Sequence, residues 1–116
     1  MKKRFLLALQ DIIDSINRIE TYTEGVEYDS FCSNQMMIDA VIRNLEIIGE
    51  ATGNVPEEVR SIYPEIPWKK MVGLRNFLIH EYFGVDESIV WEVVTTNLKD
   101  IKPLVLKAVQ EEGDII

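Results

Sequence analysis

The stretch MIDAVIRNLEIIGEA, residues 37–51, decides the fold of this chain. Its apolar residues recur every three or four positions, which is the spacing of one face of an α-helix. The main stripe consists of Ile38, Val41, Ile42, Leu45 and Ile48. A smaller apolar strip on the back consists of Ala40, Ile47 and Ala51. A helix with two apolar strips usually packs against two neighbours, so the back strip is a candidate subunit contact.

Helical periodicity continues outward from this stretch over nearly the whole chain. The central helix should span residues 31–52, with Asp29 and Ser30 as caps. The other expected helices cover residues 3–23, 57–62, 67–82 and 87–110. Asp86 can cap the last helix, and Pro103 should bend it. Residues 1–116 are therefore predicted to form one domain, an all-α up-and-down bundle of four main helices and one short one.

The composition excludes several classes of protein. No apolar run approaches the roughly 20 residues that a membrane span needs. The basic start leads into the short apolar run of residues 5–9, which polar residues follow at once, so we expect a cytoplasmic protein. A single cysteine and a single histidine argue against a disulfide or a zinc site, and Cys32 is interpreted as a small apolar filler. The net charge of −8 argues against broad nonspecific nucleic-acid binding but leaves room for a local basic site.

Residues 75–82, RNFLIHEY, carry the candidate chemistry. At about 100° per residue, the polar groups of this stretch occupy roughly one half of a helix: Arg75, Asn76, His80 and Tyr82. An arginine fork suits phosphate oxygens, a histidine transfers protons near neutral pH, and a tyrosine can stack on a base. These groups suit RNA cleavage without a metal, in which His80 transfers a proton and Arg75 stabilises the phosphorane.

One histidine cannot easily serve as both acid and base in an in-line displacement. We therefore expect a homodimer that places two such segments face to face, with the site at the interface. Lys69 and Lys70, just before the motif, can form a basic rim. The structural alternative is that His80 caps carbonyls or bonds to Glu81 and that Arg75 pairs with an acid.

Other polar and aromatic residues have simpler interpretations. Four charged residues fall in one stripe of the central helix and are interpreted as a surface ion ladder rather than as a pair orienting the motif: Asp39, Arg43, Glu46 and Glu50. Trp68 and Trp91 are interpreted as core anchors rather than as base-stacking platforms.

The sequence also resembles a known family over most of its length. The matching segments are residues 43–51, Pro67-Trp68, residues 71–86 with the Arg-x4-His-x-Tyr motif, and residues 89–91. In these segments it is similar to the HepT-like toxins of the HEPN superfamily. The resemblance implies a four- or five-helix HEPN bundle, usually dimeric, with ribonuclease activity centred on Arg75 and His80. It also implies an antitoxin, a minimal nucleotidyltransferase of the MntA type, that transfers AMP to Tyr82.

The predicted function is thus the toxin of a type VII toxin–antitoxin system, a metal-independent endonuclease acting on messenger or transfer RNA. Arg75 and His80 are the predicted catalytic residues, and Asn76, Tyr82 and Lys70 are predicted to contact the substrate. No cofactor and no metal are expected. The alternative is a non-catalytic substrate-binding module of a two-chain nucleotidyltransferase. The complete Arg75, His80 and Tyr82 set favours the enzyme, whereas the acidic surface mildly favours the module.

Overall fold

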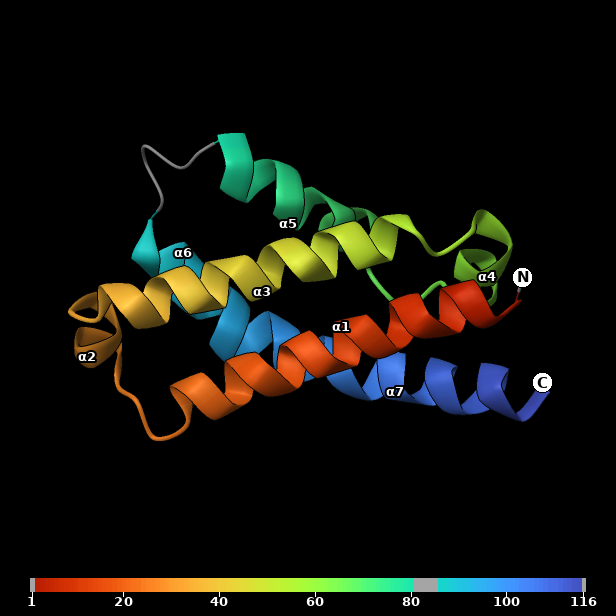
Figure 1. Ribbon diagram of the computed structural model, residues 1–116, viewed down its shortest axis with the longest axis horizontal. Helices are drawn as coiled ribbons and strands as arrows, with labels where there is room; N and C mark the ends of the chain where they lie inside the picture. The colour runs from red at the N-terminus through yellow and green to blue at the C-terminus, as the bar shows by residue number, and fades with distance from the viewer. Residues whose placement is uncertain (1, 81–85, 116) are drawn as a thin grey trace.

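The computed structural model describes residues 2–80 and 86–115, with side chains for residues 4–74 and 86–113. Within this part of the chain, every regular element is a helix (Figure 1). The elements are α1 (Lys2–Thr23), α2 (Tyr28–Cys32), α3 (Gln35–Gly53), α4 (Glu57–Ile62), α5 (Trp68–His80), α6 (Glu87–Glu92), η2 (Val93–Asn97) and α7 (Leu98–Ile115). The predicted all-α class is confirmed. Among the helices described, none combines the length and the apolar character needed to span a membrane.

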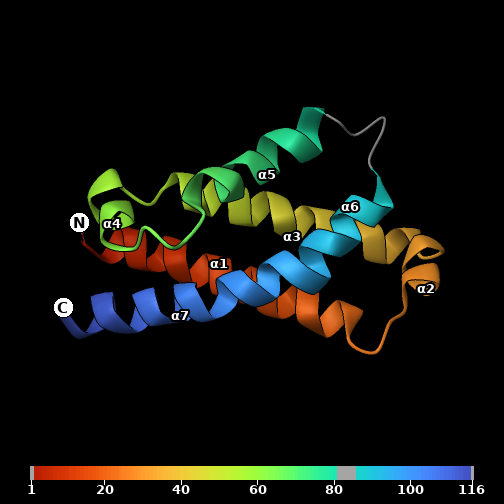
Figure 2. The same ribbon diagram turned by 180° about the vertical axis from the view of Figure 1, so that it is seen from behind.

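The long helices run alternately up and down. Both views show α1 and α3 side by side in opposite directions, with α5 over α3 and α7 along α1 (Figures 1 and 2). The apolar residues that recur at helical spacing along α1 are fully buried at Leu9, Ile12, Ile16 and Ile19. The described ends of the chain lie together at the α4 end of the bundle. The opposite end is formed by α2 and α6.

The predicted central helix is wrong at its N-terminal end. Instead of one helix over residues 31–52, the structure has the short α2 followed by α3. Asn34 separates them in an extended conformation, and its side chain accepts a hydrogen bond from the Met37 amide at 3.0 Å. Such a cap starts a new helix and satisfies one of its free amides. The caps expected at Asp29 and Ser30 therefore lie inside α2.

The central helix α3 lies between α1 and α5. Ile38, Val41, Leu45 and Ile48 are buried as predicted, and Ile42 is half-buried. In the back strip, Ala51 is buried within the chain itself, whereas Ala40 and Ile47 are half-buried. Only part of the back strip thus remains available for a subunit contact.

The last helix is longer than predicted and contains a wide turn. Elements α6, η2 and α7 follow one another without a break from Glu87 to Ile115. The wide π turn, η2, falls on the β-branched run Val93 to Thr96, where crowded side chains weaken α-helical packing. Pro103 lies inside α7, which continues through it. The expected cap is confirmed, because Asp86 accepts a hydrogen bond from the Ser88 amide at 2.8 Å.

The remaining single-residue expectations have different outcomes. Cys32 is exposed, so its interpretation as an apolar filler is wrong: it ends the short surface helix α2. Its hydrogen bond to Tyr28 raises the pKa of that phenol to about 12. Trp68 is buried as predicted, whereas Trp91 is half-buried and stacks on Phe31 with 4.9 Å between ring centroids.

Candidate functional site

Helix α5 carries the predicted motif and begins in a tightly held turn. The Trp68 indole Nε1–H donates to the carbonyls of Arg60 and Tyr63, at 3.1 and 3.0 Å. Met71 is fully buried one turn later, and Leu74 is half-buried. These contacts fix the rotation of α5 about its axis at its N-terminal half. The backbone then stays helical to His80.

The structure places the motif only through this backbone. Arg75, Asn76 and His80 lie in the last two turns of α5, but their side chains fall outside the described residues. Tyr82 and Glu81 lie wholly outside them. The predicted site contacts therefore stay predictions. Lys70, the remaining predicted substrate contact, is exposed on the first turn of α5.

Helical geometry relates the motif to the exposed part of α5. Positions 76 and 80 follow Lys69 by seven and eleven residues, which returns each to within about 20° of the Lys69 line. Gly73 lies on the same side of the helix. Met71 lies on the opposite, buried side. The face of α5 that begins at Lys69 is therefore the face on which positions 76 and 80 stand.

A groove of about 1180 Å³ lies along this face. It runs between the end of α3, the α4 segment and the first turns of α5. Its walls are mostly apolar or backbone: Gly53, Pro64, Ile66, Pro67, Trp68, Val72 and Gly73. Among the described residues that line it, three cationic side chains stand against one carboxylate: Arg60, Lys69 and Lys70 against Glu57. The groove is thus apolar in its floor and positive at its rim.

The groove is held in shape by buried and partly buried polar contacts. The Arg60 guanidinium donates to the carbonyls of Val55 and Thr52, both at 2.9 Å, and so caps the C-terminal end of α3. The buried Tyr63 hydroxyl donates to Glu112 of α7 at 2.7 Å. Burial, and then this hydrogen bond, raise the pKa of Tyr63. The α4–α5 connection is therefore tied to both α3 and α7.

A smaller cavity lies on the other side of α5. It measures about 180 Å³ and lies between Lys70, Met71 and Leu74 of α5 and Val93 and Asn97 of η2. Lys70 lines both this cavity and the groove. The Lys70 ammonium can therefore serve ligands on either side of the helix.

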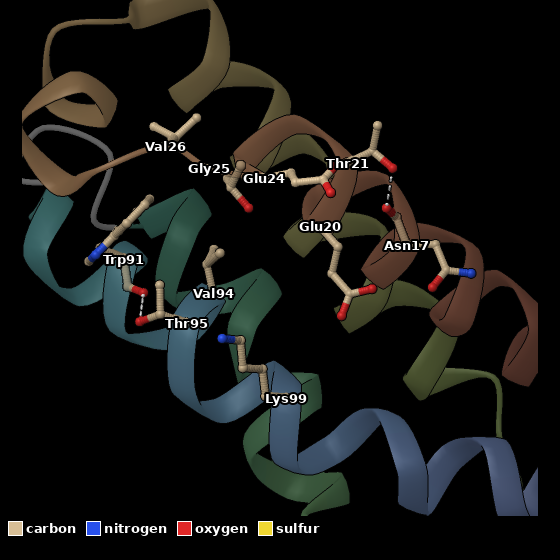
Figure 3. Close-up of a pocket in the computed structure, with 11 residues that line it drawn as sticks. Asn17, Glu20, Thr21, Glu24, Gly25, Val26, Trp91, Val94, Thr95 and Lys99 are labelled. Atoms are coloured by element: carbon tan, nitrogen blue, oxygen red, sulfur yellow. Dashed lines mark hydrogen bonds between the residues drawn. The ribbon is translucent and has the colours of Figure 1, made fainter.

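A third hollow has the opposite chemistry. This cleft, of about 640 Å³, lies between the C-terminal end of α1 and the α6–η2–α7 segment. In Figure 3, Glu20 and Glu24 stand on one wall, and Thr95 and Lys99 stand on the other, with Trp91 at one end. Two carboxylates against one lysine repel a phosphate. The cleft is therefore less favourable for an anion than the groove beside α5.

The charged stripe of α3 is only weakly paired. Arg43 and Glu46 approach to 4.0 Å, with Arg43 mostly exposed and Glu46 half-buried. Asp39 accepts a hydrogen bond from Gln35 at 2.8 Å rather than from an arginine. Among the side chains described, no three histidine, cysteine or acidic residues are grouped as metal ligands would be.

Sequence reasoning found the exposed lysines of the groove but not its walls. Lys69 and Lys70 stand next to the motif and were predicted as its rim. Arg60 and Gly53 belong to other helices, and nothing in their local sequence indicates that they line the same groove. The helical spacing from Lys69 through Gly73 to positions 76 and 80 is the signal that could have linked the groove to the motif.

Comparison with known proteins extends these observations. Residues 12–108 match the family described as ribonuclease HepT-like. A Methanocaldococcus jannaschii protein named "Putative RNase" is 46% identical over 103 residues, covering 88% of this chain and 94% of that protein. A Thermococcus cleftensis protein named "Probable ribonuclease HepT" is 40% identical over 102 residues, covering 88% of this chain and 93% of that protein. No solved structure matches the chain significantly.

Proposed function

Because this chain belongs to the ribonuclease HepT-like family, we propose that it is a metal-independent RNA endonuclease and the toxin of a type VII toxin–antitoxin pair. The family confirms the sequence-based predictions of a HepT-like relationship and of a ribonuclease. The observation that supports action on RNA is the α5 face, on which a positive-rimmed groove leads to the helix positions of Asn76 and His80. A nuclease acting on messenger or transfer RNA would work in the cytoplasm.

The proposed reaction uses the RNA itself as the nucleophile. The 2′-oxygen attacks the adjacent phosphorus and loses its proton to an imidazole. The bond from phosphorus to the 5′-oxygen breaks, and that oxygen takes a proton from an imidazolium. The products are a 2′,3′-cyclic phosphate and a free 5′-hydroxyl. Arg75 stabilises the additional negative charge on the phosphorane, and His80 transfers the protons.

A homodimer fits this chemistry better than a monomer. The two proton transfers occur on opposite sides of the phosphorus, and the chain has one histidine. Helix α5 packs mainly on α3, and a cavity separates it from η2. A second copy facing α5 would bring the partner's His80 to the other side of the phosphate.

The silencing step proposed is transfer of AMP to Tyr82 by a MntA-type nucleotidyltransferase. An added AMP group would block access to the α5 face and place a phosphate near Arg75. Incubation with the partner and ATP should add one AMP mass to the peptide containing Tyr82, and cleavage should fall as that peptide accumulates. Loss of cleavage without modification of Tyr82 would reject this step.

The experiment that tests the nuclease is digestion of several RNA classes by purified protein in EDTA. Cleavage should persist in chelator and fall on the order of 10²- to 10⁴-fold in His80→Ala and in Arg75→Ala. Lys107→Ala, on an exposed position of α7, is the matched control and should keep full activity. Absence of cleavage by unmodified protein on every RNA class would instead favour the non-catalytic nucleotidyltransferase module.

A further inference from the structure

The groove and the motif are parts of one continuous face of α5. Lys69 and Gly73 line the groove, and positions 76 and 80 lie along the same line of the helix. Lys69 and His80 are eleven residues apart, or about 16 Å along the helix axis at about 1.5 Å per residue. A ligand that lies along this face therefore reaches from the groove to the position of His80.

The chemistry of the groove suits a single-stranded nucleic acid. Its apolar lining includes the exposed Pro64 and the half-buried Val72, which can pack against the faces of bases without selecting a sequence. Lys69 and Lys70 stand exposed at the rim, where ammonium groups can pair with phosphates. A neutral amphipathic helix would need the apolar floor but not the cations. In a chain with a net charge of −8, this local excess of positive charge favours a polyanion.

The groove is also built to stay open. The Arg60 guanidinium is fixed by two carbonyls, so its charge stays at the wall. Among the described residues, a Cβ atom added at Gly73 would meet no atom within 4 Å, so the groove has open space at this helix position. The fold therefore does not need glycine at position 73 for packing. A larger side chain there would take space from a ligand rather than from the core.

We propose that this groove is an extended subsite for single-stranded RNA, which holds the nucleotides flanking the scissile phosphate. This inference rests on the proposed ribonuclease function. About 16 Å corresponds to on the order of five stacked nucleotides at about 3.4 Å each. Cleavage should therefore be more efficient on RNA long enough to fill both the groove and the motif than on a dinucleotide.

The first test removes the rim charges. Lys69→Gln/Lys70→Gln should lower kcat/KM on a twelve-nucleotide unstructured RNA at least tenfold, and by a larger factor than on a dinucleotide. The slope of log kcat/KM against log salt should become shallower by about 1.4, because two single-strand phosphate contacts are lost. Lys99→Gln/Lys107→Gln changes the net charge equally on exposed positions of α7 and should stay within twofold of wild type. Equal losses in the two pairs would overturn the subsite.

The second test fills the groove without changing the charge. Gly73→Leu and Gly73→Ala both replace a helix-interior glycine, so both should fold at least as stably as wild type. The longer side chain of Gly73→Leu would occupy groove space, so this variant should bind the long RNA at least fivefold more weakly than Gly73→Ala. Equal binding by the two variants would overturn the proposal.

Binding of the same RNA to a His80→Ala background, followed by fluorescence anisotropy, separates this inference from the nuclease. If unmodified protein cleaves no RNA but the groove variants still weaken binding, the proposed function fails and the groove stands as an RNA-binding surface without a scissile phosphate beside it. If the protein cleaves RNA but the groove variants neither change length preference nor weaken binding, the ribonuclease stands and the subsite is rejected.

Discussion

The groove beside α5 and the cleft between α1 and η2 are both open hollows, but they differ in the sign of their charge and in how they are held. Three cations and one carboxylate line the groove, whereas two carboxylates and one lysine line the cleft (Figure 3). The groove is held by buried hydrogen bonds at Trp68 and Tyr63 and by a partly buried one at Arg60. On the cleft side of the bundle, the Lys102 ammonium of α7 and the Glu20 carboxylate of α1 form a partly exposed ion pair at 2.7 Å.

This difference shows why net charge is a poor guide to the site. The value of −8 describes the whole surface, and the sequence-based expectation of weak nonspecific RNA binding follows from it. A substrate, however, meets a local potential within about a Debye length, roughly 8 Å at physiological salt. The few cations that line the groove therefore count for more than the many carboxylates elsewhere.

Reversing the sign of the groove should have the largest effect and would make the two hollows alike. Lys69→Glu/Lys70→Glu should lower kcat/KM on long RNA by about a hundredfold or more at low salt, because two attractive phosphate contacts become repulsive. The loss should shrink as salt is raised. Lys99→Glu/Lys107→Glu, with the same change in net charge, should lose much less. A similar loss in both variants would mean that net charge, and not the groove, governs RNA encounter.

The buried anchor of the groove should matter more for stability than any exposed pair. Tyr63→Phe removes the hydroxyl that donates to Glu112 and leaves a carboxylate that is only 8% exposed without this partner. The expected loss is about 1–3 kcal/mol in the free energy of unfolding. Thermal and urea unfolding measure it. Tyr22→Phe, at a position 39% exposed, is the matched control and should change stability little. Equal midpoints for the two variants would contradict a stabilising role for the Tyr63 hydrogen bond.

The ion pair between Lys102 and Glu20 should contribute less to the free energy of unfolding than the Tyr63 hydrogen bond does. Lys102→Met removes the Lys102 ammonium from Glu20, and both side chains are partly solvated, at 28% and 44% exposure. Exposed pairs are worth about 0.2–1 kcal/mol and weaken with salt. Unfolding in low and high salt measures the difference from wild type, which should shrink as salt is raised. A loss as large as that of Tyr63→Phe would remove the contrast between buried and exposed anchoring.

The sequence predicted the fold well where apolar residues recur at helical spacing over several turns. The main stripe of α3 is buried as expected except at the half-buried Ile42, and the short helix predicted at residues 57–62 is α4. The break at Asn34 was missed because apolar periodicity continues across it, whereas the cap depends on a local side-chain hydrogen bond. The exposure of Cys32 was missed for a different reason, because the exposure of a residue in a five-residue helix depends on tertiary packing.

The candidate site was predictable only along one helix. The spacing of Arg75, Asn76 and His80 follows from the geometry of a single helix, which the structure extends to His80. The walls of the groove come from three separate segments, and no local pattern specifies that Arg60 and Gly53 meet Lys69. Such long-range contacts depend on how helices pack, which a single sequence without structural information does not specify.

The smallest expected effect concerns the cap that begins the cleft-side helix. Hydrogen bonds from the Ser88 side chain and amide lower the pKa of Asp86 below its ordinary value of 3.8. A carboxyl whose folded pKa is depressed stabilises the fold above its unfolded pKa, and this contribution is lost as the pH falls through the folded pKa. Asp86→Asn keeps a good capping group but removes the titration.

The measurement is the midpoint of thermal unfolding at a series of pH values from neutral to below 3.8. As the pH is lowered, the wild-type midpoint should therefore fall more steeply than that of Asp86→Asn. Glu92→Gln, an exposed carboxylate on the same helix, is the control for simple loss of charge. Parallel curves for wild type and Asp86→Asn would show that the cap does not tie the stability of this helix to protonation.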